Sequence, residues 1–224
     1  MYIDIHTHNF RQQENVKIIR NYIFGVDACC DKHLFSSGVH PWYLSNVNIV
    51  DELFSSKVVA NANFVAVGEC GMDMTPAVLD KYPLKLQKDI FIRQLYWAEK
   101  HQKPVIIHCV RCFDKLLQIN KQLKHRNAWV IHGFSKQKAI ALQLIQAGFY
   151  LSFGAQIFES VKNRQALQAI PLNRLFLETD EQKQYDIVKI YKEAASIKAI
   201  SVSKLQNEII SNFQKVFTQK NIKI

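Results

Sequence analysis

Histidine and carboxylate side chains recur where short apolar runs of this chain end. His6 and His8 stand two residues apart in the first such run. Four further runs each end at one such residue: Glu69, His108, His132 and Asp180. Imidazole nitrogens and carboxylate oxygens are common ligands of divalent metal ions. The pattern therefore predicts a metal site assembled from residues that are far apart in the sequence.

The spacing of His6 and His8 suits a shared ion. On a β-strand, residues i and i+2 point to the same face, about 6.6 Å apart along the strand. By itself such a pair has a plainer interpretation, as two polar residues at the end of a strand. Carboxylates such as Glu69 and Asp180 are seldom buried unless they are paired or bind a metal. Because six residues share the pattern, we favour their interpretation as metal ligands.

The number of predicted ligands bears on the number of ions. A tetrahedral ion needs four ligands, and the chain offers six. The excess predicts two divalent ions about 3.5–4 Å apart, with a carboxylate between them. Occupancy by one ion stays open. The ions expected are Mg²⁺, Mn²⁺ or Zn²⁺, although a histidine-rich set suits iron and nickel as well.

Eight apolar runs are expected to form the strands that position these residues. Their ranges are 2–6, 22–28, 34–39, 64–68, 104–108, 128–132, 149–153 and 175–179. Most are continuous, which is typical of parallel strands covered on both faces. Amphipathic helical patterns lie between the later runs, among them Phe91, Leu95 and Ala98. This alternation predicts a TIM-like (β/α)₈ barrel, somewhat irregular and compact, in which the C-terminal ends of the strands converge.

Length, composition and charge set further expectations. The 224 residues, 48% of them hydrophobic, suffice for one barrel, so we expect a single domain over residues 1–224. The net charge of +10 favours anionic partners such as nucleic acid, or it reflects a solvated basic surface. The N-terminal residues lack a secretory pattern, no apolar run reaches the ~20 residues of a membrane span, and the five cysteines are expected to be free thiols. We therefore expect a cytoplasmic protein with no membrane association and no obligate protein partner.

Seven strings of the sequence together resemble a known enzyme family. They are Asp4-Ile5-His6-Thr7-His8, Gly38-Val39-His40-Pro41, Val67-Gly68-Glu69-Cys70-Gly71-Met72-Asp73, Lys103-Pro104-Val105-Ile106-Ile107-His108, His132-Gly133-Phe134-Ser135, Leu177-Glu178-Thr179-Asp180 and Asn212-Phe213. In this order, over nearly the whole chain, they resemble the TatD family of metal-dependent deoxyribonucleases, within the amidohydrolase-like barrels. The resemblance implies a TIM-like barrel with one or two metal ions. It also implies hydrolysis of phosphodiester bonds in DNA, typically by trimming from a 3′ end.

The resemblance further implies a ligand set for each ion. The ligands of the first ion would be His6, His8, Glu69 and Asp180. The ligands of the second ion would be Glu69, His108 and His132. Glu69 would therefore bridge the two ions. A divalent ion can lower the pKa of water towards about 7, which would supply the nucleophile.

Glu69 and Asp180 are the predicted catalytic residues. By the same resemblance, Asp180 would orient the attacking water and accept its proton. His40, in the Gly-Val-His-Pro string, is expected to contact substrate or support the ligands, or it is simply a polar residue before a turn. Arg111 follows His108 closely, where a guanidinium could hold a phosphate, or it is a solvated surface arginine.

The chain departs from the family pattern at the expected substrate rim. Many members carry a proline and then an arginine after the Glu-Thr-Asp string, where this chain has Glu181-Gln182-Lys183-Gln184. An enzyme that hydrolyses a small-molecule ester, amide or lactone is therefore the alternative to a nuclease acting on DNA or RNA. A basic nucleic-acid-binding protein with a structural ion is a third hypothesis. Cys109-Val110-Arg111-Cys112 has the spacing of a redox motif, but it stands beside His108 in a string that already has an interpretation.

Overall fold

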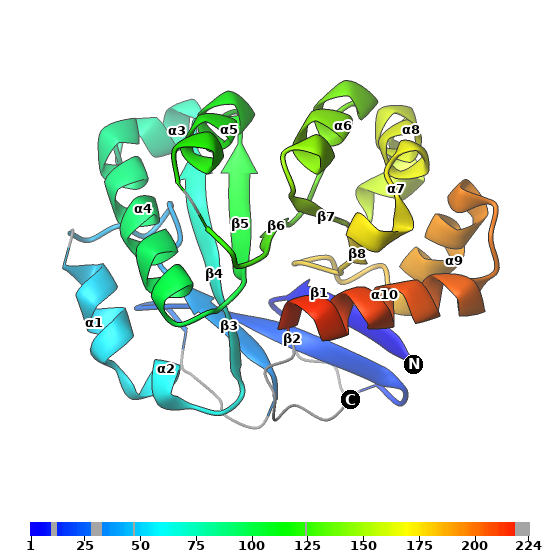
Figure 1. Ribbon diagram of the computed structural model, residues 1–224, viewed down its shortest axis with the longest axis horizontal. Helices are drawn as coiled ribbons and strands as arrows, with labels where there is room; N and C mark the ends of the chain where they lie inside the picture. The colour runs from blue at the N-terminus through cyan, green and yellow to red at the C-terminus, as the bar shows by residue number, and fades with distance from the viewer. Residues whose placement is uncertain (10–12, 28–32, 47, 124, 218–224) are drawn as a thin grey trace. The chain divides into compact units, whose positions relative to one another are not determined.

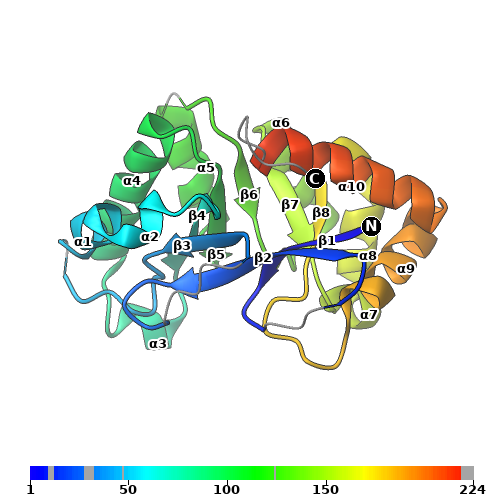
Figure 2. The same cartoon turned by 90° about the horizontal axis from the view of Figure 1, so that it is seen from below.

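Strands and helices alternate along the chain (Figure 1, Figure 2). The structure is a computed structural model, and it describes residues 1–9, 13–27, 33–46, 48–123 and 125–217. The strands are β1 Tyr2–Thr7, β2 Val16–Ile23, β3 Phe35–Gly38, β4 Phe64–Asp73, β5 Val105–Val110, β6 Trp129–Ile131, β7 Tyr150–Phe153 and β8 Leu175–Leu177. The helices are α1 Ile49–Ser55, α2 Lys57–Ala60, α3 Pro76–Leu79, α4 Leu84–Lys100, α5 Phe113–Gln122, α6 Lys138–Gln146, α7 Gln156–Glu159, α8 Val161–Ala169, α9 Ile187–Lys198 and α10 Val202–Phe217, with the 3₁₀ turn η1 Leu172–Arg174. This is the succession of elements expected for a (β/α)₈ protein.

The chain divides into two compact units. The first unit comprises Met1–Arg20 and Val130–Ile224, and the second comprises Asn21–Trp129. Each unit has its own paired strands and its own covering helices. The expectation of one domain over residues 1–224 stays a prediction.

The first unit pairs five strands in parallel, in the order β6-β7-β8-β1-β2. Leu151 is the partner of Leu175 between β7 and β8, and a bridge between Thr7 and Asp180 joins β1 to the chain that follows β8. Helix α10 packs on β1 and β8 (Figure 2). Its side chain at Phe213 is fully buried, and burial of one such ring contributes roughly 1.5–3 kcal/mol.

The second unit pairs β3, β4 and β5 in parallel, and α4 packs on β4 (Figure 1). The predicted apolar stripe Phe91, Leu95 and Ala98 is buried along α4, as the helical period requires. A second apolar cluster lies under α1 and includes Val39 and Leu53. The packing of α4 supports β4, whose polar residues are described below.

Six of the eight predicted strands overlap the observed ones closely, and the second and fourth need correction. The range 22–28 is wrong, because β2 runs from Val16 to Ile23 and ends where Gly25 takes a φ of +82°. Asp27 Oδ2 accepts a hydrogen bond from the Ile23 N–H at 2.8 Å, which closes the turn. β2 contains polar residues such as Arg20, so it is not a continuous apolar run and was not predicted from that pattern.

β4 continues beyond the predicted end at residue 68, as far as Asp73. Glu69 therefore lies inside a strand and not at its end, and His108 likewise lies inside β5. The expectation that both residues end their strands is wrong. The strand continues because its polar groups find partners within the second unit. In the part of the chain that the structure describes, no helix is long and apolar enough to cross a membrane.

Candidate metal centre

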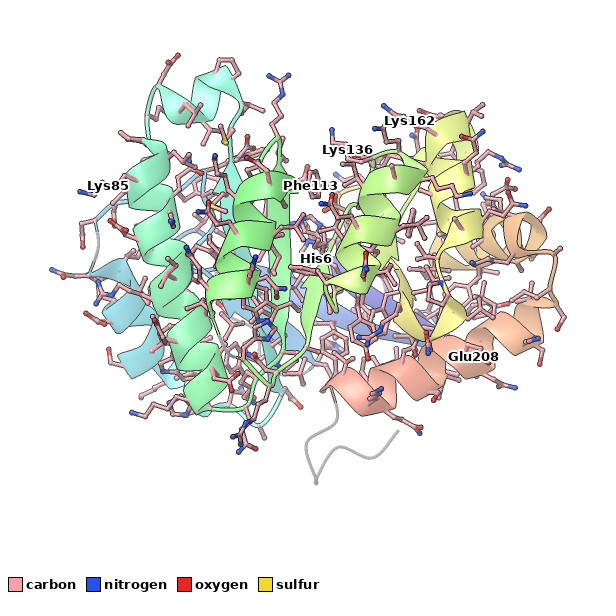
Figure 3. The ribbon with its side chains drawn as sticks, turned by 45° about the horizontal axis from the view of Figure 1, so that its top comes forward. His6, Lys85, Phe113, Lys136, Lys162 and Glu208 are labelled. Atoms are coloured by element: carbon pink, nitrogen blue, oxygen red, sulfur yellow. The ribbon has the colours of Figure 1, made fainter. Side chains whose placement is uncertain are left out.

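His6, His8 and Asp180 form one group of possible metal ligands in the first unit. The Nε2 atoms of both histidines lie 3.6 Å from Oδ1 of Asp180. His6 is fully buried and lies in the interior of the fold (Figure 3). The Asp180 side chain is 29% exposed, so water or substrate can reach its carboxylate. The structure therefore brings three predicted site residues together.

The backbone explains how Asp180 reaches the end of β1. Its N–H donates to the His6 carbonyl at 2.9 Å, and its carbonyl accepts from the His8 N–H at 3.2 Å. Asp180 takes a φ of +54°, in the left-handed region that aspartate tolerates better than most residues. Two backbone bonds thus hold the carboxylate beside both imidazoles.

His132 and Glu178 lie on the same side of the first unit. The His132 and His6 rings are 4.2 Å apart between centroids, and Nδ1 of His132 lies 3.4 Å from Oε1 of Glu178. Glu178 is fully buried, and its Oε1 accepts from the Gly133 N–H at 2.6 Å. A ligand atom of each of His132, Glu178 and Asp180 lies within 4.8 Å of the other two. Glu178 is not among the ligands predicted from the sequence, although it stands two residues before Asp180 in the same string.

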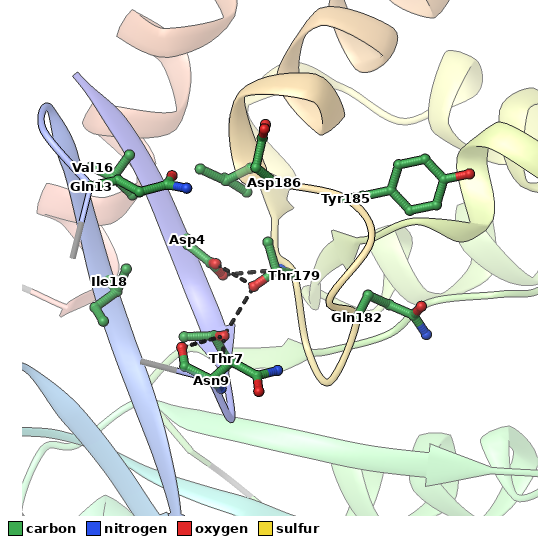
Figure 4. A pocket seen from close by; sticks show the side chains of 11 residues that line it. Asp4, Thr7, Asn9, Gln13, Val16, Ile18, Thr179, Gln182, Tyr185 and Asp186 are labelled. Atoms are coloured by element: carbon green, nitrogen blue, oxygen red, sulfur yellow. Dashed lines mark hydrogen bonds between the residues drawn. The ribbon is translucent and has the colours of Figure 1, made fainter. Parts of the chain in front are cut away.

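A hydrogen-bonded network joins Asp4, Thr179 and Thr7 (Figure 4). Oδ2 of Asp4 accepts from the Thr179 hydroxyl at 2.6 Å, and Oδ1 accepts from the N–H groups of Thr179 at 3.1 Å and His6 at 3.3 Å. Burial raises the pKa of Asp4 to about 7, although the bonds from Thr179 oppose that rise. Asp4 thereby fixes the backbone on both sides of the first group. It also lines a polar pocket with Gln182 and Tyr185.

His40, Glu69 and His108 form the corresponding group in the second unit. Oε1 of Glu69 lies 2.7 Å from Nδ1 of His108 and 3.1 Å from Nε2 of His40. The backbone N–H of Trp42 donates to Nδ1 of His40 at 3.2 Å, so neutral His40 carries its proton on Nε2 and donates to Glu69. This tautomer is consistent with the expected role of His40 as support rather than ligand. The carboxylate of Glu69 and Nδ1 of His108 then remain for an ion.

No role was predicted from the sequence for Asn21, Trp42 and Asp73, which hold this group through hydrogen bonds. Asn21 donates its Nδ2–H to Oε2 of Glu69 at 3.2 Å, and its Oδ1 accepts from the Glu69 N–H at 2.8 Å. Asp73 Oδ2 accepts from Nε1 of Trp42 at 2.7 Å and lies 3.2 Å from Nε2 of His108. Burial raises the pKa of Asp73, but hydrogen bonds from His108, Trp42 and Thr75 outweigh it and hold the pKa well below its usual range. Asp73 stands in the same string as Glu69, but the sequence does not show that it contacts His108 and Trp42, because those contacts form only when the chain folds.

Two glycines set the approach of β4 to β5. A Cβ at Gly68 would lie 2.5 Å from the carbonyl oxygen of Ile106, and a Cβ at Gly71 would overlap the carbonyl oxygen of His108. Both glycines also take positive φ values, +147° and +150°, which side chains rarely adopt. The Gly-Glu-Cys-Gly string is therefore what lets Glu69 come within reach of His108.

The remaining candidates lie near β5. Arg111 is exposed directly after the strand, with a φ of +59°. The Sγ atoms of Cys109 and Cys112 are 3.5 Å apart, but burial raises the pKa of Cys109 well above that of a free thiol. A redox thiol needs the opposite shift, so these cysteines have the properties of structural residues.

The donor sets fit divalent ions. Two ligand atoms on a tetrahedral zinc ion, each bonded at 2.0–2.1 Å, would be about 3.4 Å apart. The separations of 3.6 Å in the group His6, His8 and Asp180 are close to that value. In the second unit, Nδ1 of His108 and Oε1 of Glu69 are 2.7 Å apart, which is hydrogen-bond distance, so the two atoms would have to separate to hold one ion between them. A bridge by Glu69 would join residues of both units, and it stays a prediction.

Comparisons with known proteins agree with this chemistry. The sequence profile of the family described as TatD related DNase matches residues 3–218. YcfH of Escherichia coli strain K12, described as an uncharacterized metal-dependent hydrolase, is 29% identical over 204 residues, which cover 84% of this chain and 74% of YcfH. YabD of Bacillus subtilis strain 168, described in the same words, is 30% identical over 149 residues, which cover 64% of this chain and 56% of YabD.

Solved structures show the same fold. The crystal structure of YjjV, a TatD homologue from Escherichia coli K12, matches with a TM-score of 0.82 at 23% identity and covers 99% of this chain and 98% of YjjV. A TatD family hydrolase from Entamoeba histolytica matches with a TM-score of 0.73 at 18% identity, covering 96% and 97% of the two chains. At these identities the likeness concerns the fold alone, and it confirms the predicted TIM-like (β/α)₈ class. Because the family profile spans nearly the whole sequence, this chain belongs to the TatD-related DNase family and is a metal-dependent hydrolase.

Proposed function

We propose that this hydrolase cleaves phosphodiester bonds of DNA and trims strands from the 3′ end. The observation that carries the proposal is the position of Asp180, whose carboxylate lies 3.6 Å from two imidazoles and is 29% exposed. A carboxylate in that position can both hold an ion and reach a water molecule. Metal-dependent hydrolysis uses this combination, and the family whose profile matches this chain is described as TatD related DNase, which favours a phosphodiester substrate.

Each residue of the site has a distinct role in the proposed reaction. One or two divalent ions, when bound, lower the pKa of water and offset negative charge on the phosphoryl oxygens. Asp180 orients the attacking water and takes up its proton. Glu69 holds the second group together, since its two oxygens contact His108, His40 and Asn21. The backbone groups of His6 and His8 hold the backbone of Asp180, which places its carboxylate beside their imidazoles.

The charge of the chain supports a polyanionic substrate. A net charge of +10 attracts nucleic acid over a distance, and the attraction falls as salt screens it. RNA shares that charge, so it is a substrate to test beside DNA. Arg111, exposed after β5, is a candidate to contact a backbone phosphate.

A second candidate function is hydrolysis of a small polar ester, amide or lactone. It is favoured by the pocket next to Asp4, which is lined by uncharged polar side chains such as Gln182 and Asn9 (Figure 4). Gln182 belongs to the segment in which many family members have the proline and arginine of the substrate rim. A pocket of this character suits a small molecule as well as a nucleotide.

The deciding experiment combines metal analysis with a nuclease assay. Purified protein is analysed for metal and then incubated with 5′-labelled single-stranded DNA and Mg²⁺ or Mn²⁺. Stepwise shortening from the 3′ end that stops on addition of EDTA supports the proposal. Hydrolysis of small esters or amides with intact DNA would establish the second candidate instead.

The role of Asp180 has its own variant. Asp180→Asn keeps the shape of the side chain but cannot accept a proton, so we expect loss of nearly all turnover with an unchanged circular dichroism spectrum. Asp89→Asn makes the same chemical change at an exposed residue of α4 and serves as the matched control. An Asp180→Asn protein that cleaves DNA at the rate of the control would refute the role.

A further inference from the structure

Two neighbouring aromatic residues are exposed next to the group His40, Glu69 and His108. Trp42 is 46% exposed and Tyr43 is 42% exposed. Both rings contact His40, with centroids 5.1 Å and 5.8 Å from the imidazole. Single exposed apolar residues are common on proteins and need no explanation. Two adjacent ones that pack against His40 present an aromatic surface beside a candidate site.

The indole of Trp42 is held in place. Its Nε1–H donates to Oδ2 of Asp73 at 2.7 Å, and its ring lies 5.8 Å from the His108 ring at an angle of 75°. Asp73 is only 1% exposed, so this bond is shielded from water. An aromatic side chain that is already fixed loses little conformational freedom when it binds a ligand. These contacts preorganise Trp42 while leaving nearly half of its surface open.

A basic residue stands close to this aromatic surface in the strand register. Val110 is the partner of Asp73 between β4 and β5, and Arg111 follows Val110. The exposed guanidinium of Arg111 therefore comes from the segment beside the residue that holds Trp42. An aromatic ring next to an arginine is the combination that binds single-stranded nucleic acid, because the ring stacks on a base and the cation meets the backbone.

We propose that Trp42, with Tyr43 beside it, stacks on the base of one of the two nucleotides that flank the scissile phosphodiester. This inference rests on the proposed nuclease function and extends it to a base-binding subsite. A base and its phosphate are joined through one sugar, so a base stacked on Trp42 keeps its phosphate near His108. Stacking accepts every base, and it contributes about 1–3 kcal/mol per base, which corresponds to roughly 5- to 150-fold in binding.

The test varies the enzyme and the substrate together. Single-stranded DNA is prepared with all bases, with an abasic 3′-terminal nucleotide, and with an abasic penultimate nucleotide. For the wild-type enzyme we expect kcat/KM to fall about 5- to 150-fold on one of the abasic substrates. On DNA with all bases, kcat/KM of Trp42→Leu should be lower than that of the wild type by the same factor. On that abasic substrate, kcat/KM of Trp42→Leu should fall no further.

Two further variants separate stacking from other effects. Trp42→Phe keeps an aromatic face but loses the hydrogen bond to Asp73, so it should retain most of the discrimination between the two substrates. Tyr96→Leu removes another exposed aromatic side chain, 62% exposed on α4, and should leave all substrates unaffected. If Trp42→Phe and Trp42→Leu lose equal factors on every substrate, Trp42 acts only through Asp73 and the stacking role is wrong.

Binding in the presence of EDTA gives a readout that does not depend on turnover. Fluorescence anisotropy of a fluorescein-labelled oligonucleotide with all bases should show weaker binding to Trp42→Leu than to the wild type. On the abasic oligonucleotide that the wild-type enzyme cleaves more slowly, the two proteins should bind equally. Wild-type enzyme that cleaves all three substrates equally overturns the subsite and leaves the nuclease proposal standing. Intact DNA under all conditions overturns the nuclease proposal, and the subsite with it.

Discussion

Asp73 and His108 are joined through the ring nitrogen of His108 that faces away from Glu69. Oδ2 of Asp73 lies 3.2 Å from Nε2, while Nδ1 of the same ring lies 2.7 Å from Oε1 of Glu69. A carboxylate that accepts from one nitrogen fixes the tautomer and raises the basicity of the other nitrogen. Asp73 therefore prepares His108 to bind a cation, although it makes no contact with the ion's expected position.

The first prediction concerns this pair. Asp73→Asn removes the charge and keeps only one acceptor oxygen, so either the Thr75 N–H loses its acceptor or His108 and Trp42 both do. We therefore expect metal affinity to fall by about 10- to 100-fold. Isothermal titration of the metal-free protein with Zn²⁺ or Mn²⁺ measures the change. Trp42→Phe removes only the other hydrogen bond to the same carboxylate and should bind metal nearly as the wild type does. Equal metal affinity in Asp73→Asn and wild-type protein would show that Asp73 does not support the site.

The second prediction concerns the bridging role expected for Glu69. Glu69→Gln keeps the hydrogen-bonding shape towards Asn21 but removes the negative charge. If Glu69 bridges two ions, the metal content should fall for both ions, and elemental analysis should find less than one ion per chain. A fall from two ions to one would instead show that Glu69 serves a single ion.

The sequence pointed to the residues of these groups because each stands in or after a strand that is continuous and apolar. His6, His8 and Asp180 meet as expected, since parallel strands bring their ends to one edge. The polar partners Asn21 and Asp73 could not be predicted in the same way. Asn21 lies in a strand that was missed, and the burial of Asp73 depends on β4 running past its apolar run.

The misplacement of Glu69 has the same cause. A polar residue after an apolar run is taken as the end of a strand, because an isolated buried carboxylate is costly. In this chain the cost is offset by hydrogen bonds from Asn21 and by the imidazoles of His40 and His108. These contacts join residues that are far apart in the sequence, so they cannot be predicted before the pairing of the strands is known.

The third prediction concerns Gly71. Gly71→Ala places a methyl group onto the carbonyl oxygen of His108 and demands a φ of +150° from alanine, so β4 and β5 must separate beside Glu69. Gly148→Ala is the matched control, because Gly148 also has a positive φ of +95° but no atom lies within 4 Å of its added Cβ.

We expect Gly148→Ala to lower the free energy of unfolding by about 1–3 kcal/mol, the cost of the backbone conformation alone. Gly71→Ala should cost clearly more than the control and should also reduce metal content. Urea denaturation and elemental analysis measure the two effects. Equal losses in the two variants would mean that the β4–β5 approach tolerates a side chain.

The fourth prediction concerns the connection of α9 to β1 through Tyr191. The Tyr191 hydroxyl accepts from the Ile3 N–H and donates to the Ile3 carbonyl, both at 3.1 Å, across 188 residues of sequence. Tyr191 is fully buried, so Tyr191→Phe leaves both backbone groups of Ile3 without this partner in an apolar surrounding. An unsatisfied buried polar group costs about 1–3 kcal/mol, and we expect a loss of stability in that range. Tyr185→Phe retains the stacked contact with Phe158 and should change stability by less than about 0.5 kcal/mol. Urea unfolding of both variants measures the difference, and a Tyr191→Phe protein as stable as Tyr185→Phe would show that β1 does not depend on this hydroxyl.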